Sequence, residues 1–430
     1  MLLASEGASE EILTLEKCVE LALKNSPAIH QAWLEKEKAV VKIKEARTAF
    51  YPQLELSANY TRLDESPSIE GGSFGGISFG DISFGDDDIY SLKGSAQQPI
   101  YTGGKIDTSY RIAKISKELA DWDYEKVKAD LILKAKSAYF QALKAEKFKL
   151  VAGEAVRQVE AHRDLTSNLL EAGIVAKLDL LKAEVVLAQT KQNLIKAEDG
   201  LKMAQSNLNI LLDRPIEEKV ALEELEDYKP LNLTLDTCLK RAMADRPELK
   251  QMEMNIALAK LGLKLARSSY YPKVALIGDY DYQKGSSQAP EDWEGSWSIT
   301  LSGSINPWDF GKTRSQVKVA GLELSRVEDG QAQLVDGITL EVQQAYLASH
   351  TAFSSIEVAK EAIGEAEEGL RITEEKYKVG MATSTDVLDA QTDLISARTN
   401  YYTALYDYFI AMAELSKATG EKFPYNLDRQ

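Results

Sequence analysis

The chain has 430 residues, of which 44% are hydrophobic and 27% charged, values typical of a globular protein and not of a disordered one. Its formal net charge of -16 argues against nucleic acid as a partner, because neutralising phosphates requires an excess of Lys and Arg. No apolar run approaches the roughly 18 residues of a transmembrane helix, which excludes helical membrane spans. A closed β-barrel stays possible, because its strands give a weaker sequence signal. The first residues, MLLASEGASEE, lack a basic n-region, so we expect that a signal peptide was either removed or never present.

The two halves of the chain repeat each other. One set of matches lies 220 residues apart: Leu15 and Leu235, Cys18 and Cys238, Pro27 and Pro247, and Tyr51 and Tyr271. A second set lies 207 residues apart: Gly104 and Gly311, Tyr139 and Tyr346, Gly173 and Gly380, and Asp179 and Asp386. The change of shift places a 13-residue insertion between Tyr60 and Gly104 of the first copy. Register kept over so many positions indicates a tandem duplication.

Each copy predicts the same order of elements: helix, two strands, a very long helix, a tip and a second long helix. The first copy is residues 1–212, with a helix broken at Pro27, strands at 52–62 and 89–100, and a tip near 173–179. The second copy is residues 235–420, with strands at 272–283 and 295–306 and a tip near 380–386. We expect residues 213–234 to form an inter-repeat linker or equatorial segment, and 421–430 a C-terminal tail.

A heptad pattern marks the second long helix of each copy. The run from Lys105 to Ala172 contains no proline, which predicts a helix about 100 Å long, and another helix is expected from Leu178 to Leu212. In that second helix a leucine recurs every seven residues, with a mostly small residue three positions later. The leucines are Leu180, Leu187, Leu194, Leu201 and Leu208, and their partners are Ala183, Thr190, Ala197, Ala204 and Leu211. Repeated in the second copy, this pattern predicts a mainly α fold of two long, closely packed helical hairpins.

The four strands alternate apolar and polar residues. In QLELSANYT, for example, Leu54, Leu56 and Tyr60 alternate with small or polar side chains. A soluble sheet with one buried face has this pattern too, but two features favour a membrane barrel: a polar face of Ser, Thr, Asn and Gln, and aromatic residues at the strand ends. Those aromatic residues are Tyr51, Tyr60, Tyr90, Tyr101, Tyr270, Tyr271, Tyr282, Trp293, Trp297 and Trp308. Four strands cannot close a barrel, so a membrane location requires oligomerisation.

The sequence shows no residue pattern typical of catalysis or cofactor binding. None of His30, His162 and His350 has a partner at metal-ligand or catalytic-triad spacing, and each is expected on a helix surface or seam. The repeat should keep Cys18 and Cys238 apart, so no disulfide is expected. Carboxylates at Asp86, Asp87 and Asp88 are compatible with calcium, but a surface loop is the favoured interpretation. We therefore expect no enzyme activity, no cofactor and no metal site.

The sequence resembles the TolC-type outer-membrane efflux protein family over nearly its whole length. The resemblance rests on ALKNSPAI and AMADRPEL, on the Tyr-Pro before each outgoing strand, on QPIYTGGK and NPWDFGK, and on the two tips. It implies a homotrimer, with four strands per chain forming a shared 12-stranded outer-membrane barrel and with a long α-helical barrel in the periplasm. It also implies a passive exit duct of tripartite efflux pumps or type I secretion systems. Its partners would be outer-membrane lipid, a periplasmic adaptor and, through that adaptor, an inner-membrane transporter.

The resemblance further assigns roles at the tips. Asp179 resembles a gate aspartate, and Tyr377 the gate tyrosine of a YxVG motif. Asp386 and Asp389 resemble two rings of lumenal carboxylates, which would favour cations because like charges repeat around a narrow bore. The alternative for Asp179 and Asp386 is a helix cap or first-turn charge. The residues expected to dock the adaptor are Gly173, Ile174, Val175, Ala176, Gly380, Met381, Ala382 and Thr383.

One position departs from the family. Some members carry a gate-locking arginine two residues after the second-repeat glycine, where this chain has Ala382.

A non-membrane coiled-coil scaffold with a small sheet remains the alternative function. The sequence does not distinguish drugs, metals and proteins as exported substrates.

Overall fold

The computed structural model describes residues 12–66, 85–225, 227–289 and 291–421, together with the backbone of 68–69, 73–74, 77–78 and 82–83. The expected tail beyond residue 421 and most of the Gly/Ser-rich insertion lie outside these described residues. The chain divides into two compact units. One unit comprises Met1–Leu34, Trp122–Lys250 and Gln331–Gln430, and the other Glu35–Asp121 and Gln251–Gly330. Each unit therefore draws segments from both sequence repeats.

Each repeat begins with two helices that meet at a proline. Helices α1 (Leu15–Asn25) and α2 (Pro27–Thr48) in the first copy correspond to α5 (Leu235–Asp245) and α6 (Pro247–Arg267) in the second, where a short 3-10 turn, η1 (Ser268–Tyr270), follows. The residue before each proline is extended, because the proline ring disfavours helical geometry there. The proline itself occupies the first helical position, where its missing N–H is no loss. The predicted break at Pro27 is confirmed.

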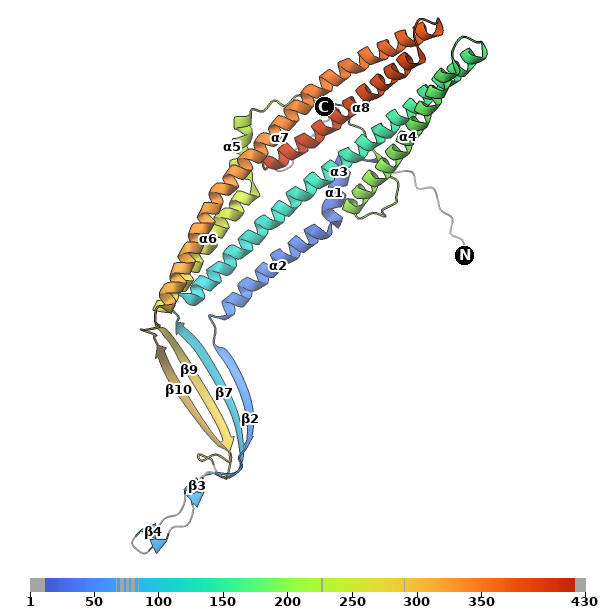
Figure 1. Cartoon of the computed structure of the whole chain (residues 1–430). Helices are drawn as coiled ribbons and strands as arrows, with labels where there is room; N and C mark the ends of the chain where they lie inside the picture. Colours follow the sequence, from blue (N-terminus) through green and yellow to red (C-terminus); the bar gives the residue numbers. More distant parts are fainter. Residues whose placement is uncertain are drawn as a thin grey trace, which may run out of the picture. The chain divides into compact units, whose positions relative to one another are not determined.

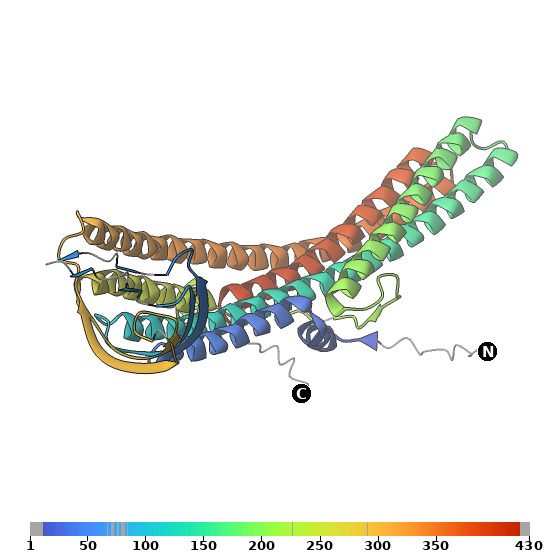
Figure 2. The same cartoon turned by 90° about the horizontal axis from the view of Figure 1, so that it is seen from below.

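The predicted long helices are confirmed as two hairpins. Helices α3 (Lys105–Glu171) and α7 (Lys312–Lys378) each have 67 residues, and they return as α4 (Lys177–Leu212) and α8 (Ser384–Ala418). Figures 1 and 2 both show α4 beside the end of α3, and α8 beside the end of α7. The predicted seam is buried or half-buried throughout, with Ala183 and Val387 almost fully enclosed.

The core of the first unit centres on Tyr139 of α3. It gathers apolar residues of α1, α3, α4 and α8. Residues 213–234 contribute β8 (Ala221–Leu222), which pairs in parallel with β1 (Ile12–Leu13). The buried Tyr139 hydroxyl donates to the Glu223 carbonyl at 2.6 Å and lies 3.2 Å from that of Leu13, so the inter-repeat segment is fastened to the hairpin. A second cluster repeats this arrangement with Cys238, Ala242 and Val342.

The second unit holds a four-stranded antiparallel sheet in the order β10-β9-β7-β2. Its strands are β2 (Gln53–Arg62), β7 (Asp88–Tyr101), β9 (Lys273–Lys284) and β10 (Glu294–Ser304). Across the sheet, Leu56 pairs with Gly94, Gly94 with Tyr280, and Tyr280 with Trp297. One face is therefore apolar from edge to edge. The other face is polar and includes a Lys93–Asp279 ion pair of 3.4 Å. Figure 2 shows the sheet curved into an arc.

Short strands occupy the described parts of the insertion. There β3 (Ser68–Ile69) pairs with β6 (Ile82–Ser83), and β4 (Ser73–Phe74) pairs with β5 (Ile77–Ser78). Within the described ranges, no helix combines the length and apolar character needed to cross a membrane. Nor do three His, Cys, Asp or Glu side chains gather there as a possible metal site. Cys18 and Cys238 are both buried and unpaired.

Candidate functional site

The two hairpin tips turn with the same backbone geometry. Gly173 and Gly380 have φ of +74° and +73°, the left-handed conformation that glycine adopts without a Cβ penalty. After α3, the Ile174 N–H bonds the Leu169 carbonyl at 2.9 Å, and after α7 the Met381 N–H bonds the Lys376 carbonyl at 2.8 Å. These are Schellman caps, and they explain why both copies keep a glycine at this place.

The returning helices begin differently. At the second tip, Thr383 and Asp386 form a capping box: the Thr383 hydroxyl accepts from the Asp386 N–H at 3.2 Å, and the Asp386 carboxylate accepts from the Thr383 N–H at 2.7 Å. The Thr383 hydroxyl also donates to the Asp386 carboxylate at 2.8 Å, and the hydrogen bonds that this carboxylate accepts from the Thr383 backbone and hydroxyl lower its pKa. At the first tip Ala176 stands where the second has Thr383, and α4 has no side-chain cap. The helix-cap interpretation of Asp386 is confirmed, whereas Asp179 is a first-turn charge without a box.

A buried polar cluster joins the two hairpins just behind their tips. We call it the tip cluster, and it consists of His162 and Thr166 of α3, Tyr377 of α7 and Ser384 of α8. The His162 Nε2 lies 2.9 Å from the Ser384 Oγ, and the Thr166 Oγ1 lies 3.0 Å from the Tyr377 hydroxyl. The rings of His162 and Tyr377 are 5.1 Å apart. All four residues are at most 5% exposed, so these contacts connect the hairpins away from water.

Apolar residues surround the tip cluster. Leu370, Tyr377, Val387 and Leu394 form a buried group against which Leu165, Leu169 and Val175 of the first hairpin pack. Ala382, at the position of the family's arginine, packs against the same group and is half-buried.

The structure places the remaining predicted tip residues as follows. Tyr377 is buried and bonds Thr166, and no hydrogen bond or ion pair joins it to Asp179 in the described part of the chain. Asp179 is half-buried, whereas Asp386 and Asp389 are exposed. Of the expected docking residues, Gly173, Ile174, Ala176, Gly380, Met381 and Thr383 are exposed, and Val175 and Ala382 are half-buried. Ile174 and Met381 are 63% and 77% exposed, which leaves two large apolar side chains at the ends of the hairpins.

Three members of the tip cluster were not singled out from the sequence as site residues: His162, Thr166 and Ser384. His162 and Ser384 are 222 residues apart in the chain, so no local pattern joins them. Comparison of the two repeats was the one way to single out these positions from the sequence. At the 207-residue shift, His162 corresponds to Gly369 and Ser384 to Lys177, so the two copies carry different types of side chain at both positions.

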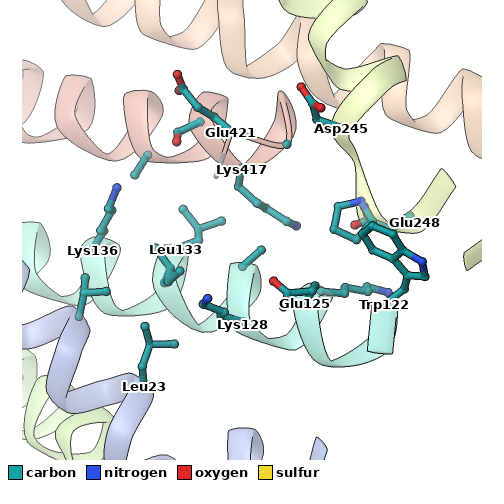
Figure 3. Close-up of a pocket in the computed structure, with 18 of the residues that line it drawn as sticks. Leu23, Trp122, Glu125, Lys128, Leu133, Lys136, Asp245, Glu248, Lys417 and Glu421 are labelled. Carbon is teal, nitrogen blue, oxygen red and sulfur yellow. The ribbon is translucent and has the colours of Figure 1, made fainter. Parts of the chain in front are cut away.

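A separate cavity of about 620 Å³ lies in the first unit, lined by α1, α3, α8 and the α5–α6 junction. Figure 3 shows Trp122, Lys136, Glu248 and Lys417 around it. The Lys417 amine pairs with Asp130 at 3.1 Å and Glu341 at 3.5 Å. The described lining residues include no histidine or cysteine, and its charges are mixed in sign, so the cavity offers no arrangement for nucleophilic catalysis.

The comparisons with known proteins agree with this architecture. A family described as outer membrane efflux protein matches residues 18–213 and 238–421. The chain is 24% identical over 383 residues to outer membrane protein TolC of Escherichia coli, covering 85% of this chain and 73% of that one. It is 24% identical over 377 residues to alkaline protease secretion protein AprF of Pseudomonas aeruginosa, covering 86% and 76%. The structure of the Campylobacter jejuni CmeC outer membrane channel matches with a TM-score of 0.83 at 19% identity, covering 96% and 87%.

Paired long helical hairpins with a small antiparallel sheet give the chain the fold of that outer membrane channel. The chain belongs to the outer membrane efflux protein family. It is an outer-membrane exit duct for efflux or secretion that extends into the periplasm. Because the family consists of passive channels, the protein is not an enzyme.

Proposed function

We propose that three copies of this chain assemble into one duct. The four strands of each copy would pair with those of the next to close a 12-stranded barrel in outer-membrane lipid. The helical hairpins would form a tube in the periplasm, whose tips dock to a periplasmic adaptor and through it to an inner-membrane transporter. Transport makes and breaks no bond, and the tips close the tube until the adaptor docks.

The unpaired edges of the sheet are the observation that carries this proposal. Strands β2 and β10 each have one neighbour, so each leaves a row of backbone groups unpaired. Every residue of β10 is exposed. Trp297, Ile299 and Leu301 are at least 69% exposed on its apolar face. An open edge is not tolerated in lipid, and pairing β2 of one copy with β10 of the next removes both edges.

A groove between α7 and α8 supports assembly of the helices. It is shallow, encloses about 1080 Å³, and is lined largely by small side chains. These small residues include Ala352, Ser355, Ala359, Ala397, Ala404 and Ala411. Small residues allow close approach of helix backbones, so the groove suits a helix of a neighbouring copy.

At the tips we propose the roles that the family resemblance implies. Asp179 and Tyr377 act in the gate, and Asp386 and Asp389 form two lumenal carboxylate rings in the trimer. The exposed Ile174 and Met381, with their neighbouring tip residues, form the adaptor-docking surface. Support comes from the exposure of both ring carboxylates and from the buried position of Tyr377 between the hairpins.

Fractionation of cells that express the full chain tests the proposal. We expect the protein in the outer-membrane fraction, released only by detergent, and chemical cross-linking of the extracted protein should give a trimer. A monomer that remains in solution without detergent would overturn the duct and favour the non-membrane scaffold. Reconstitution in planar bilayers then tests conduction directly, because a duct must give ion current that a scaffold does not.

A further inference from the structure

His162 differs from the other two histidines of the chain. His30 and His350 are exposed on α2 and α7, whereas His162 is 5% exposed at the interface between the two hairpins. Its Nε2 bonds the Ser384 hydroxyl, and no partner for its Nδ1 is found in the described part of the chain. A neutral imidazole fits this place, because it needs only one hydrogen bond to Ser384 and carries no charge into the apolar surroundings.

The N-terminal end of the helix that begins at Ser384 disfavours the protonated, positively charged form of His162. Ser384 is the first residue of α8, and the N-terminal end of a helix carries a partial positive charge. The elements around His162 carry the titratable residues Glu160, Arg163, Lys182, Glu374, Tyr377, Lys378 and Asp386 near the tips. Two of them already have partners: Glu160 pairs with Lys191, and Arg163 with Asp164. Burial lowers the pKa of His162 below its usual range.

We propose that the tip cluster is a latch between the two hairpins of each protomer, and that protonation of His162 releases it. This inference rests on the proposed closure of the duct at the tips. With His162 neutral, the His162–Ser384 and Thr166–Tyr377 contacts hold the first hairpin against the second. Once protonated, His162 has a second N–H for which the described part of the chain supplies no acceptor, and it carries a charge at a site that is 5% exposed. Separation of the hairpins hydrates both, so acid favours the open tip.

The direction of the pH dependence follows from this difference in hydration. In the closed tip the pKa of His162 is lowered, whereas in the open tip it approaches the ordinary value of about 6.5. The closed state therefore keeps its full stability above about pH 6.5 and loses it as the pH falls toward the lowered pKa. Each titrating histidine lowers the closed-to-open ratio by up to about tenfold per pH unit. A trimer would carry three such histidines.

The latch also accounts for closure without an arginine at Ala382. The side chains of the tip cluster come from both copies of the repeat, two from α3 and one each from α7 and α8. Their counterparts at the 207-residue shift are Gly369, Thr373, Leu170 and Lys177, which do not reproduce the set. The duplicated chain therefore has one such cluster in the part that the structure describes.

Conductance in planar bilayers, measured from neutral to mildly acidic pH, tests the latch. For the unaltered protein we expect the current to rise as the pH falls below about 6.5. His162→Gln keeps a hydrogen-bonding group but does not titrate, so its current should stay low and independent of pH. Ser384→Ala removes the partner and should raise the current at neutral pH. His30→Gln, which removes an exposed histidine from α2, is the matched control and should behave like the unaltered protein.

A pH response that persists unchanged in His162→Gln would overturn the latch while leaving the duct intact. Absence of current in every variant at every pH would instead overturn the proposed duct. NMR titration of histidine-labelled trimer in detergent gives an independent readout. We expect the His162 resonance to titrate below the ordinary histidine value of about 6.5. A His162 that titrates at or above that value would refute the inference whatever the current does.

Discussion

Arg246, between α5 and α6, gives the sharpest test of how the first unit is held together. Its side chain is 4% exposed and donates to Glu248 at 2.8 and 3.0 Å and to Glu341 at 2.6 Å. Glu248 is itself only 13% exposed in its side chain. Arg246→Ser therefore leaves a buried carboxylate without its cation, and removal of one partner from a buried pair costs about 3–5 kcal/mol.

The first repeat supplies the matched control. At the 220-residue shift, Ser26 and Ala28 occupy the places of Arg246 and Glu248, and the same helix junction forms there without charges. The double variant Arg246→Ser with Glu248→Ala should thus cost much less than Arg246→Ser alone. We expect a coupling free energy of about 2 kcal/mol or more between the two sites.

Urea unfolding of the detergent-extracted protein, followed by far-UV circular dichroism, measures these differences. Burial raises the pKa of Glu248, but the hydrogen bonds from Arg246 and from its own backbone outweigh it and lower the pKa overall. The pair therefore stabilises the fold above the ordinary glutamate value of 4.5, and this contribution is lost as the pH falls through the lowered pKa. Arg246→Ser should lose less stability on acidification than the unaltered protein. Additive costs of the two substitutions would refute the reasoning.

Two further predictions concern the tips. Asp386→Asn combined with Asp389→Asn should reduce cation selectivity and block by trivalent cations in bilayers. The double variant removes charge, while the amide oxygen at position 386 can still accept from Thr383. The control Asp199→Asn removes an exposed charge on α4 and should change neither property; equal effects of the two variants would contradict the ring assignment. Thr383→Ala should destabilise the second tip by about 1 kcal/mol, and Ala176→Thr should stabilise the first by a similar amount by completing a capping box with Asp179. Hydrogen exchange of the first-turn amides measures both, and unchanged protection in either variant would contradict the capping argument.

The helices and strands were predictable because their signals are periodic and local. The leucine and alanine positions of the seam, such as Leu187 and Ala183, recur in one heptad register, and that register decides which face is buried. Likewise, the alternation around Leu56 identifies the apolar face of β2 without any knowledge of its neighbours. The order of the strands was not available from this pattern, because pairing of β7 with β9 joins the two repeats across the sequence.

The candidate site was predictable only where it lies within one tip. The Schellman glycines and the Thr383–Asp386 box depend on neighbouring residues, so spacing reveals them. The tip cluster depends on how α3 packs against α7 and α8, and this packing brings His162 to Ser384. Sequence reasoning could limit His162 to a surface or a seam of its helix, but not name the hydroxyl that it meets. β8 was missed as a strand because two residues carry no periodicity.

The buried cysteines make the protein ready for site-directed chemistry. Cys18 and Cys238 are both 0% exposed, and burial raises the pKa of the Cys18 thiol to about 12. A thiolate is the reactive form, so neither native sulfur should take up a maleimide from neutral solution while the fold is intact. A single cysteine placed at the exposed Met381 or Ile174 would then be the reactive thiol of the folded chain. Fluorophores or spin labels can follow the movement of the hairpin ends without first removing the native cysteines.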